Sequence, residues 1–225
     1  MLRLFFDWSE VWSLLIPLTI LIVKKKRYAD YLKPVIAYIL ITLFIFFTAN
    51  IIWKYKNDWN LPQWLQSNNF LYNTHAILQF FLFGLFFFRL KQPFAILLKK
   101  LLFPVFIGFS IVNFIFFENF FFYNSISSHI HSVGVGLLLV YCLLYFLFLL
   151  LDDSVLVIQK QKGFWIVSAL TIYVTVNFFI FLFYSTLILD EKNNHWAENI
   201  WDVHNATFLL LCICIAKTFY EQPEK

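Results

Sequence analysis

The residues of this chain best suited to chemistry are histidines set within long apolar stretches. Four of the five histidines, His75, His129, His131 and His204, follow the start of such a stretch by roughly five to eight residues, which is about 7–12 Å along a helix. An ionisable side chain inside a membrane helix is costly, so by default it marks a functional site. The spacing therefore predicts a polar layer of histidines at one depth.

Other polar residues fall beside these histidines. The helical period puts Tyr72, His75 and Gln79 on one face, whereas His129 and His131 point about 200° apart and cannot both face the same neighbour. Asn177 lies near the centre of its own apolar stretch. The expected ligand-binding residues are polar side chains that lie within apolar segments. They are His75, Gln79, His131, Asn177, His204 and Asn205.

Two cofactors would suit such a layer. His75, His131 and His204 with the carboxylate of Asp202 are ligands that zinc accepts. His75 and His204, if they face one another, could instead hold haem iron from both sides. The chain has no HExxH or HxxxH motif, so either cofactor needs separate helices to converge. The alternative is structural, because polar side chains in membrane bundles also bond neighbouring helices, at about 1 kcal/mol each.

The elements that must position these residues are membrane helices. Hydrophobic residues make up 61% of the 225 residues and charged residues 13%, against about 45–50% and about 25% in soluble domains. The chain therefore lacks the polar surface needed to face water on all sides. The same composition excludes a disordered chain, a disulfide scaffold and an ordinary nucleic-acid-binding module.

Seven apolar stretches are candidates for crossing a hydrocarbon core of about 30 Å, which takes about 20 residues. They predict an all-α, seven-transmembrane-helix bundle forming a single domain over residues 1–225. Pro17 lies inside the first helix, and the fourth could begin as early as Phe94. The first is expected to be retained, because it lacks a basic n-region and a small-residue cleavage site. The expected helices cover residues 8–23, 34–53, 70–90, 101–117, 127–151, 164–189 and 196–219.

The charged residues predict the orientation. With the N-terminus outside, 13 of the 17 Lys and Arg residues fall on the inner side, as the positive-inside rule requires. Most acidic residues, including Glu10, Glu118 and Asp202, then lie at the outer side, and seven of the eight tryptophans form an outer aromatic belt. We expect a multi-pass protein of a bacterial cytoplasmic (inner) membrane, with a cytoplasmic C-terminus.

An internal repeat is also suggested. The stretches that begin at His75 and His204 each open with histidine, close with a cation and continue into Gln-Pro. This pattern fits two parallel three-helix repeats joined by a single helix, an arrangement found in sugar-carrier-like and vitamin-carrier-like transporters.

Three short motifs resemble an uncharacterised family of small bacterial seven-transmembrane-helix proteins. They are LYNTH at residues 71–75, FWIVS at 164–168 and IWDVHN at 200–205. The resemblance implies a fold and no particular activity. In that family a glutamate often follows the histidine of the third helix and another lies near the start of the fifth, whereas Gln79 and His131 stand at those places here.

Three functions are compatible with these features. The first is an integral membrane protein that takes up a small ligand or cation from outside in a sensory or accessory role, with the bilayer, a membrane protein or a second copy as partner. The second is a small-solute transporter of the three-plus-one-plus-three type. The third is an intramembrane zinc-dependent hydrolase, in which the metal would lower the pKa of a bound water to about 7. The first is favoured over an enzyme, because no catalytic motif stands out.

Overall fold

The computed structural model describes residues 8–24, 27–56, 58–59, 62, 65–122, 125–152, 157–189 and 194–221, with the backbone alone for residues 185–189 and 194–198. Within these ranges the chain is helical and has no strand, which confirms the predicted all-α class. Its α-helices are α2 (Ser9–Lys24), α3 (Lys33–Tyr55), α4 (Asn69–Arg89), α5 (Ile96–Phe116), α6 (Ser128–Leu151), α7 (Phe164–Leu189) and α8 (Asn194–Glu221). Two short 3-10 helices, η1 (Asp30–Leu32) and η3 (Ile158–Lys160), precede α3 and α7.

Six of the described helices, α3 to α8, are long and apolar enough to cross a membrane. Helix α2 has 16 residues, which at 1.5 Å per residue is about 24 Å and shorter than a hydrocarbon core of about 30 Å. The protein is therefore an all-helical, multi-pass membrane protein. A seventh span formed by α2 stays a prediction.

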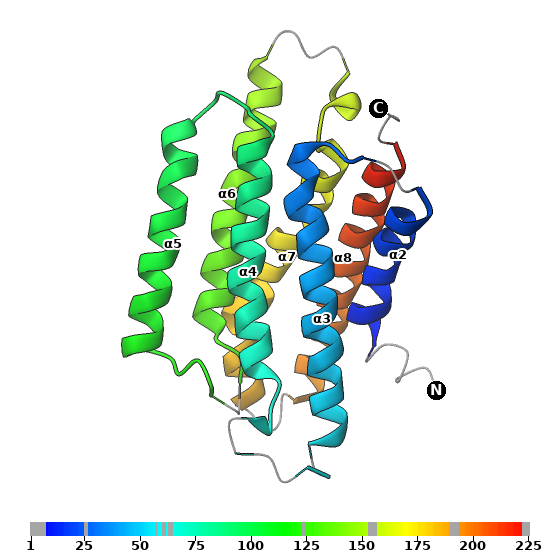
Figure 1. The fold of residues 1–225 in the computed structure, drawn as a ribbon. Coiled ribbons are helices and arrows are strands. Elements are labelled where there is room, and N and C mark those ends of the chain that lie inside the picture. The colour runs from blue at the N-terminus through cyan, green and yellow to red at the C-terminus, as the bar shows by residue number, and fades with distance from the viewer. Residues whose placement is uncertain are drawn as a thin grey trace.

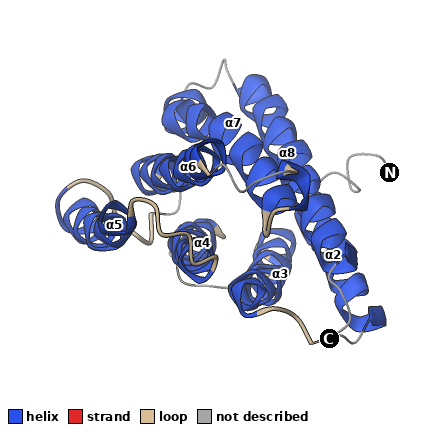
Figure 2. Cartoon of the chain, turned by 90° about the horizontal axis from the view of Figure 1, so that it is seen from above, coloured by secondary structure: helices blue, strands red, loops and turns tan. Residues whose placement is uncertain are grey.

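Six helices form a ring, and α5 lies outside it (Figure 2). Around the ring, α2 packs on α3, α3 on α4, α4 on α6, α6 on α7, α7 on α8, and α8 returns to α2. Helix α5 packs only on the outer side, against α6 and α4. Side chains from all six ring helices can therefore meet in the interior.

The helices run alternately up and down the bundle (Figure 1). We call the end at which α2, α4, α6 and α8 begin the Glu10 end, and the end at which α3, α5 and α7 begin the Lys99 end. Helix α5 begins five residues earlier than expected, at Ile96. Its first turns tolerate Lys99 because the aliphatic stem packs inward, and the Tyr141 hydroxyl donates to the Lys99 carbonyl at 2.6 Å.

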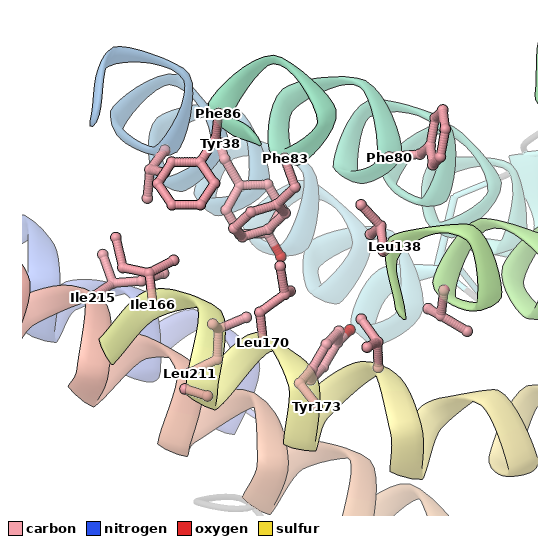
Figure 3. Packing of buried hydrophobic residues seen from close by; sticks show 14 of the residues in the cluster. Tyr38, Phe80, Phe83, Phe86, Leu138, Ile166, Leu170, Tyr173, Leu211 and Ile215 are labelled. Carbon is pink, nitrogen blue, oxygen red and sulfur yellow. The ribbon is translucent and has the colours of Figure 1, made fainter. Parts of the chain in front are cut away.

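The ring interior is apolar toward the Lys99 end. Figure 3 shows large buried side chains of different helices meeting there, with Phe83 and Phe86 of α4 on the side that faces Leu170 of α7 and Leu211 of α8. Each of these four side chains is fully buried. Tyr38 borders this apolar region, with its ring 4.7 Å from that of Phe83. Close packing of this kind leaves few voids, so the polar side chains of the interior gather nearer the Glu10 end.

Candidate functional site

A buried carboxylate, Glu10, lies in the first turn of α2. Its residue is 3% exposed. Its Oε2 accepts a hydrogen bond from the Tyr72 hydroxyl of α4 at 2.8 Å, and its Oε1 lies 3.6 Å from Nε2 of His204 on α8. A carboxylate buried in a membrane bundle is costly unless a partner compensates it. Here a hydroxyl and an imidazole from two other helices do so.

Asn177 of α7 fixes the ring of His204. Its side-chain nitrogen donates to the Tyr173 carbonyl at 2.8 Å and to the Thr207 hydroxyl at 3.1 Å. Its Oδ1 is therefore the atom that faces Nδ1 of His204, at 2.5 Å. An amide oxygen only accepts, so Nδ1 of His204 carries a hydrogen and donates it. The Nε2 atom is then free to exchange a proton on the side that faces Glu10.

Glu10 and His204 together hold one proton in their neutral state. Either Glu10 carries it and faces a neutral imidazole, or His204 carries it and faces a carboxylate. Both arrangements have zero net charge, whereas loss of the proton or gain of a second leaves one uncompensated charge buried. Because an isolated buried charge is strongly unfavourable, a cation that enters the site is best accommodated when this proton leaves.

Helices α3 and α4 contribute the next part of the network. His75 is buried, and its Nε2 lies 3.3 Å from the Tyr38 hydroxyl. Gln79 donates its side-chain N–H to the same hydroxyl at 3.2 Å. Because that hydroxyl accepts from Gln79, it is free to donate its own hydrogen to His75. The predicted shared face of Tyr72, His75 and Gln79 does line the ring interior.

His131 of α6 completes the group of buried histidines. It is 5% exposed, and its Nε2 has no hydrogen-bond partner among the described residues. The ring of Phe181 lies 4.5 Å from that of His131 and 5.6 Å from that of His204. The Phe46 ring lies 4.7 Å from that of His75 and 5.7 Å from that of Phe208, which is nearly parallel to the His204 ring. The structure thus brings these three histidines into one interior region.

Aromatic rings surround His204. The Trp201 ring stacks on it at 4.7 Å, and the Phe208 ring is nearly parallel to it at 6.4 Å. Tyr173 adds a ring at 5.7 Å. Aromatic rings therefore enclose the imidazole of His204. The faces of aromatic rings attract cations.

His129 does not join the buried histidines. Its side chain is 60% exposed, and its Nδ1 lies 3.5 Å from Oε1 of Glu118 and 3.2 Å from Oδ1 of Asn113. The reason is the angle of about 200° between His129 and His131 on one helix. When His131 faces the ring interior, His129 must face away from it.

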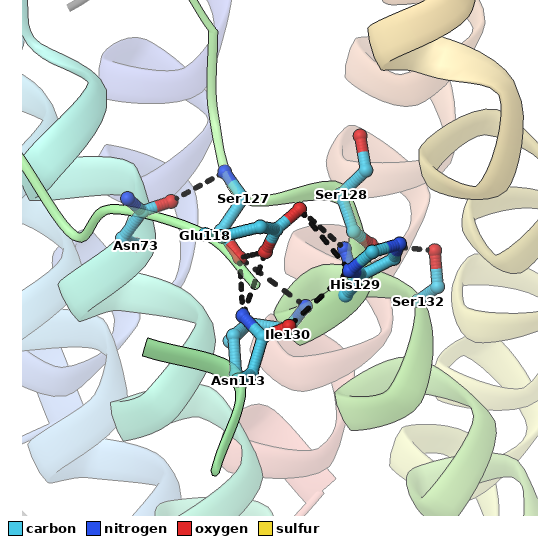
Figure 4. Close-up of polar contacts among 8 residues, drawn as sticks. All are labelled: Asn73, Asn113, Glu118, Ser127, Ser128, His129, Ile130 and Ser132. Carbon is cyan, nitrogen blue, oxygen red and sulfur yellow. Dashed lines mark hydrogen bonds and ion pairs between the residues drawn. The ribbon is translucent and has the colours of Figure 1, made fainter. Parts of the chain in front are cut away.

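Glu118 belongs to a second polar cluster, drawn in Figure 4, which fastens the start of α6. Ser127 is the N-cap of α6, and its side chain accepts a hydrogen bond from the Ile130 N–H. Glu118 accepts from the Ser127 hydroxyl and from the Asn113 amide at 2.7 Å. Asn73 of α4 accepts from the Ser127 N–H at 2.8 Å. These contacts cap a helix and join α4, α5 and α6, so we assign this cluster a structural role.

The predicted zinc ligands do not assemble. Asp202 is exposed, while its three expected partner histidines are buried. Within the part of the chain that the structure describes, no group of three or more His, Cys, Asp or Glu residues is placed to hold a metal ion. Asp202 and His204 are two positions apart on α8, which is about 200° around the helix. Asp202 therefore faces away from the ring interior.

The residues do not fit a haem held between His75 and His204 either. The Nε2 atom of His75 faces the Tyr38 hydroxyl, and that of His204 faces Glu10. The ring of Phe46 lies against His75, at 4.7 Å. The two imidazoles therefore do not present free nitrogens to one iron.

The remaining predicted residues are buried but differ in their contacts. Gln79 and Asn177 lie in the hydrogen-bonded network. Asn205 is 8% exposed, and its Oδ1 has no partner among the described residues. No described contact joins it to the histidines. Its place in a ligand-binding set stays a prediction.

The sequence analysis places Glu10 at the outer side and does not include it among the site residues, whereas the structure buries it. Its burial has a signal in the sequence, because Glu10, Ser13 and Pro17 lie at positions 0, 3 and 7 of one helical face. All three are buried. A face of small and polar residues on an otherwise apolar helix indicates a packed interface, and this face carries the carboxylate into the ring.

Comparisons of the chain with protein family models, with curated proteins and with solved structures found no match. The function is therefore inferred from the geometry of the chain itself. Membership of the bacterial seven-helix family stays a prediction.

Proposed function

We propose that the protein is a multi-pass protein of the cytoplasmic membrane that binds a small cation at the Glu10–His204 pair, beside His131, in exchange for a proton and in a sensory or accessory role. One observation carries the proposal. Glu10 Oε1 and His131 Nε2 are buried atoms without a hydrogen-bond partner among the described residues, and the Phe181 ring packs against both His131 and His204. A buried polar atom left without a partner costs about 1–3 kcal/mol. A small cation beside the carboxylate of Glu10 would recover that cost, and the buried charge stays balanced when the proton of the pair leaves.

The chemistry of the site favours a cation over an anion or a neutral solute. Glu10 supplies the negative charge, a neutral imidazole supplies a lone pair, and aromatic rings face the site. The buried side chains described around His204 include no lysine or arginine that would attract an anion. The close packing of the interior limits the guest to a small ion.

The position of the site supports access from one side. Glu10 lies in the first turn of α2, at the Glu10 end. The interior beyond Tyr38 is filled by Phe83, Phe86 and Leu211. With the orientation that the charged residues predict, the Glu10 end faces outward. Binding without passage through the membrane is the behaviour that this arrangement supports.

A small-solute transporter is the second candidate, and the ring order favours it. In this symmetry α2 corresponds to α6, α3 to α7 and α4 to α8. The contact between α4 and α6 then corresponds to the contact between α8 and α2. Helix α5 then takes the place of the joining helix outside the ring. Two parallel three-helix repeats have this symmetry. The apolar packing toward the Lys99 end argues against a solute path, so uptake of cations into proteoliposomes should not exceed that of protein-free liposomes.

Thermal unfolding in detergent tests the leading proposal. The purified protein is measured in chloride salts of sodium, potassium and ammonium at constant ionic strength. A ligand that binds only the folded state stabilises it by about 2.7 kcal/mol at a hundredfold excess over its Kd. We expect at least one of the three cations to raise the Tm of the wild type and to leave that of Glu10→Gln unchanged.

Glu118→Gln is the matched control. It removes a carboxylate of the same type from the capping cluster, where Glu118 contacts Asn113 and Ser127. We expect this variant to be less stable but to keep the full cation-dependent rise in Tm. If no cation shifts the wild type, or if the shift survives in Glu10→Gln, the proposal is wrong.

A further inference from the structure

Two cavities lie side by side at the Lys99 end, and neither belongs to the proposed cation site. One has a volume of about 290 Å³ and is lined by Phe87, Phe88, Pro93, Ile96, Lys91 and Lys99. The other has a volume of about 360 Å³ and is lined by Asp30, Lys33, Arg89 and Lys91. Lys91 contributes to both, so the two form one continuous region between η1, the end of α4 and the start of α5.

Lys99 is the unusual residue of the first cavity. It is 2% exposed, and its Nζ makes one long hydrogen bond, of 3.4 Å, to the Gln92 side chain. A lysine ammonium has three donors. No carboxylate lines the first cavity. A buried ammonium without an acidic partner is strongly unfavourable, so the cavity calls for an anion beside Nζ.

The second cavity adds positive charge. Lys33, Arg89 and Lys91 face a single carboxylate, Asp30. Lys33 pairs with that carboxylate at 2.6 Å, while Arg89 donates to the Asp30 backbone carbonyl at 3.2 Å. Together the two cavities therefore have a formal excess of positive charge.

The loop between the two helices is held in an unfavourable backbone conformation. Lys91 and Ala95 both have positive φ angles, of 56° and 53°. Such a conformation costs a residue other than glycine about 1–3 kcal/mol and is found more often at ligand sites than elsewhere. Lys91, which has one of these conformations, and Lys99 both line the first cavity.

We propose that this region binds an anionic phospholipid, with the headgroup phosphate against Lys91 and Lys99 and an acyl chain along the apolar wall. Phosphate supplies the charge and the acceptors that these lysines lack. Basic pockets between membrane helices are suited to anionic headgroups. The wall of Phe88 and Ile96 argues for a lipid over free phosphate, because Ile96 is 45% exposed and lies on α5, outside the ring.

Native mass spectrometry of the full chain in detergent tests this site. The protein is incubated with phosphatidylglycerol, with phosphatidylcholine of the same acyl chains, or with inorganic phosphate. Phosphatidylcholine carries the same phosphate but adds a quaternary ammonium, which the excess positive charge around the two cavities repels. We expect the wild type to retain phosphatidylglycerol at least about tenfold better than phosphatidylcholine, and to retain no inorganic phosphate.

Three variants locate the site. Lys91→Gln and Lys99→Gln should each abolish the preference for phosphatidylglycerol, while Lys100→Gln, which changes an exposed lysine that lines neither cavity, should keep it. If Lys99→Gln does not fold, Lys91→Gln provides the test, because Lys91 is exposed. Equal retention of the two lipids, binding of inorganic phosphate alone, or the same loss in Lys100→Gln would each overturn the proposal.

Discussion

Among the individual side chains, Asn177 has the clearest positioning role. Its two donor contacts, to Tyr173 and Thr207, leave only its oxygen for His204. The imidazole is thereby held in one tautomer, with Nε2 toward Glu10. A histidine that could turn over would face the carboxylate only part of the time. The pair depends on this third residue as much as on its own two members.

A substitution at His131 can test cation binding with little effect on the stability of the fold. Its Nε2 has no partner among the described residues, and its ring packs on Phe181. Replacing an unpaired polar group by an apolar one of similar shape is nearly neutral for stability or even favourable. We expect His131→Phe to leave the Tm in the absence of added salt within a few degrees of the wild-type value, and to abolish the cation-dependent rise.

His129→Phe is its control, two residues away on the same helix. The exposed His129 contacts Glu118 and Asn113, so its loss should leave the cation-dependent rise intact. Equal effects of the two substitutions on the cation response would contradict the assignment of His131 to the site.

At this scale the buried histidines have a stronger signal in the sequence than the carboxylate, whose burial is indicated only by the face that it shares with Ser13 and Pro17. The cost of burying an imidazole in an apolar helix singles out His75, His131 and His204 wherever they pack. A glutamate in the first turn of a helix has a second favourable environment, because the N-terminal end of a helix attracts negative charge even when it is solvated. Position alone therefore could not decide whether Glu10 is inside or outside.

Among the elements, α5 differs from the rest because it packs on the ring and takes no part in it. Its contact with α4 is close at Gly84, where an added Cβ atom would lie 2.6 Å from Cζ of Phe103. Glycine is needed at this approach because any side chain must displace the Phe103 ring. Helix α5 is thus held by one face, while much of its remaining surface is apolar and exposed.

A larger residue at position 84 tests whether the ring keeps its cation response when the packing of α5 on α4 is disturbed. Overpacking costs typically about 1–3 kcal/mol, so we expect Gly84→Leu to lower the Tm and to weaken retention of phosphatidylglycerol, whose proposed site includes α5. The cation-dependent rise in Tm should persist, because no residue of that site lies on α5. A simultaneous loss of the cation response would show that α5 supports the ring interior.

Helix positions follow closely from the apolar runs, and their ends follow less well. The helix expected at residues 164–189 has those bounds in the structure, as Phe164–Leu189. The helix expected at 101–117 begins instead at Ile96. Lysines appear to end an apolar run in the sequence, yet their aliphatic stems are compatible with a helical turn. The positions of the charged residues in the sequence therefore do not show where such a helix begins.

Over the whole molecule, the two ends have opposite chemistry. Glu10 and the buried histidines lie toward one end, and the basic cavities lie at the other. The all-helical membrane class could be predicted from composition. The order of helices around the ring could not, because a lipid tail and a neighbouring helix are equally apolar, so the sequence does not distinguish the helix faces that contact each.

The orientation predicted by the charged residues is testable by cysteine labelling in intact cells. Asn119 and Lys160 are exposed and lie at opposite ends of the bundle. We expect a membrane-impermeant maleimide to label Asn119→Cys without permeabilisation, and Lys160→Cys only after it. The native Cys142 and Cys212 are fully buried, and the unsubstituted chain controls for labelling of Cys214. The reverse labelling pattern would contradict an outward-facing Glu10.

The central claim is that a cation enters at Glu10 and His204 as a proton leaves. Proton release tests it most directly, with a pH-sensitive dye in weakly buffered detergent solution and the cation that raises the Tm. We expect about one proton released per cation bound by the wild type, because the pair accommodates only one positive charge without leaving net charge buried. We expect no release from Glu10→Gln. Cation binding without proton release, or release that persists in Glu10→Gln, would contradict the account.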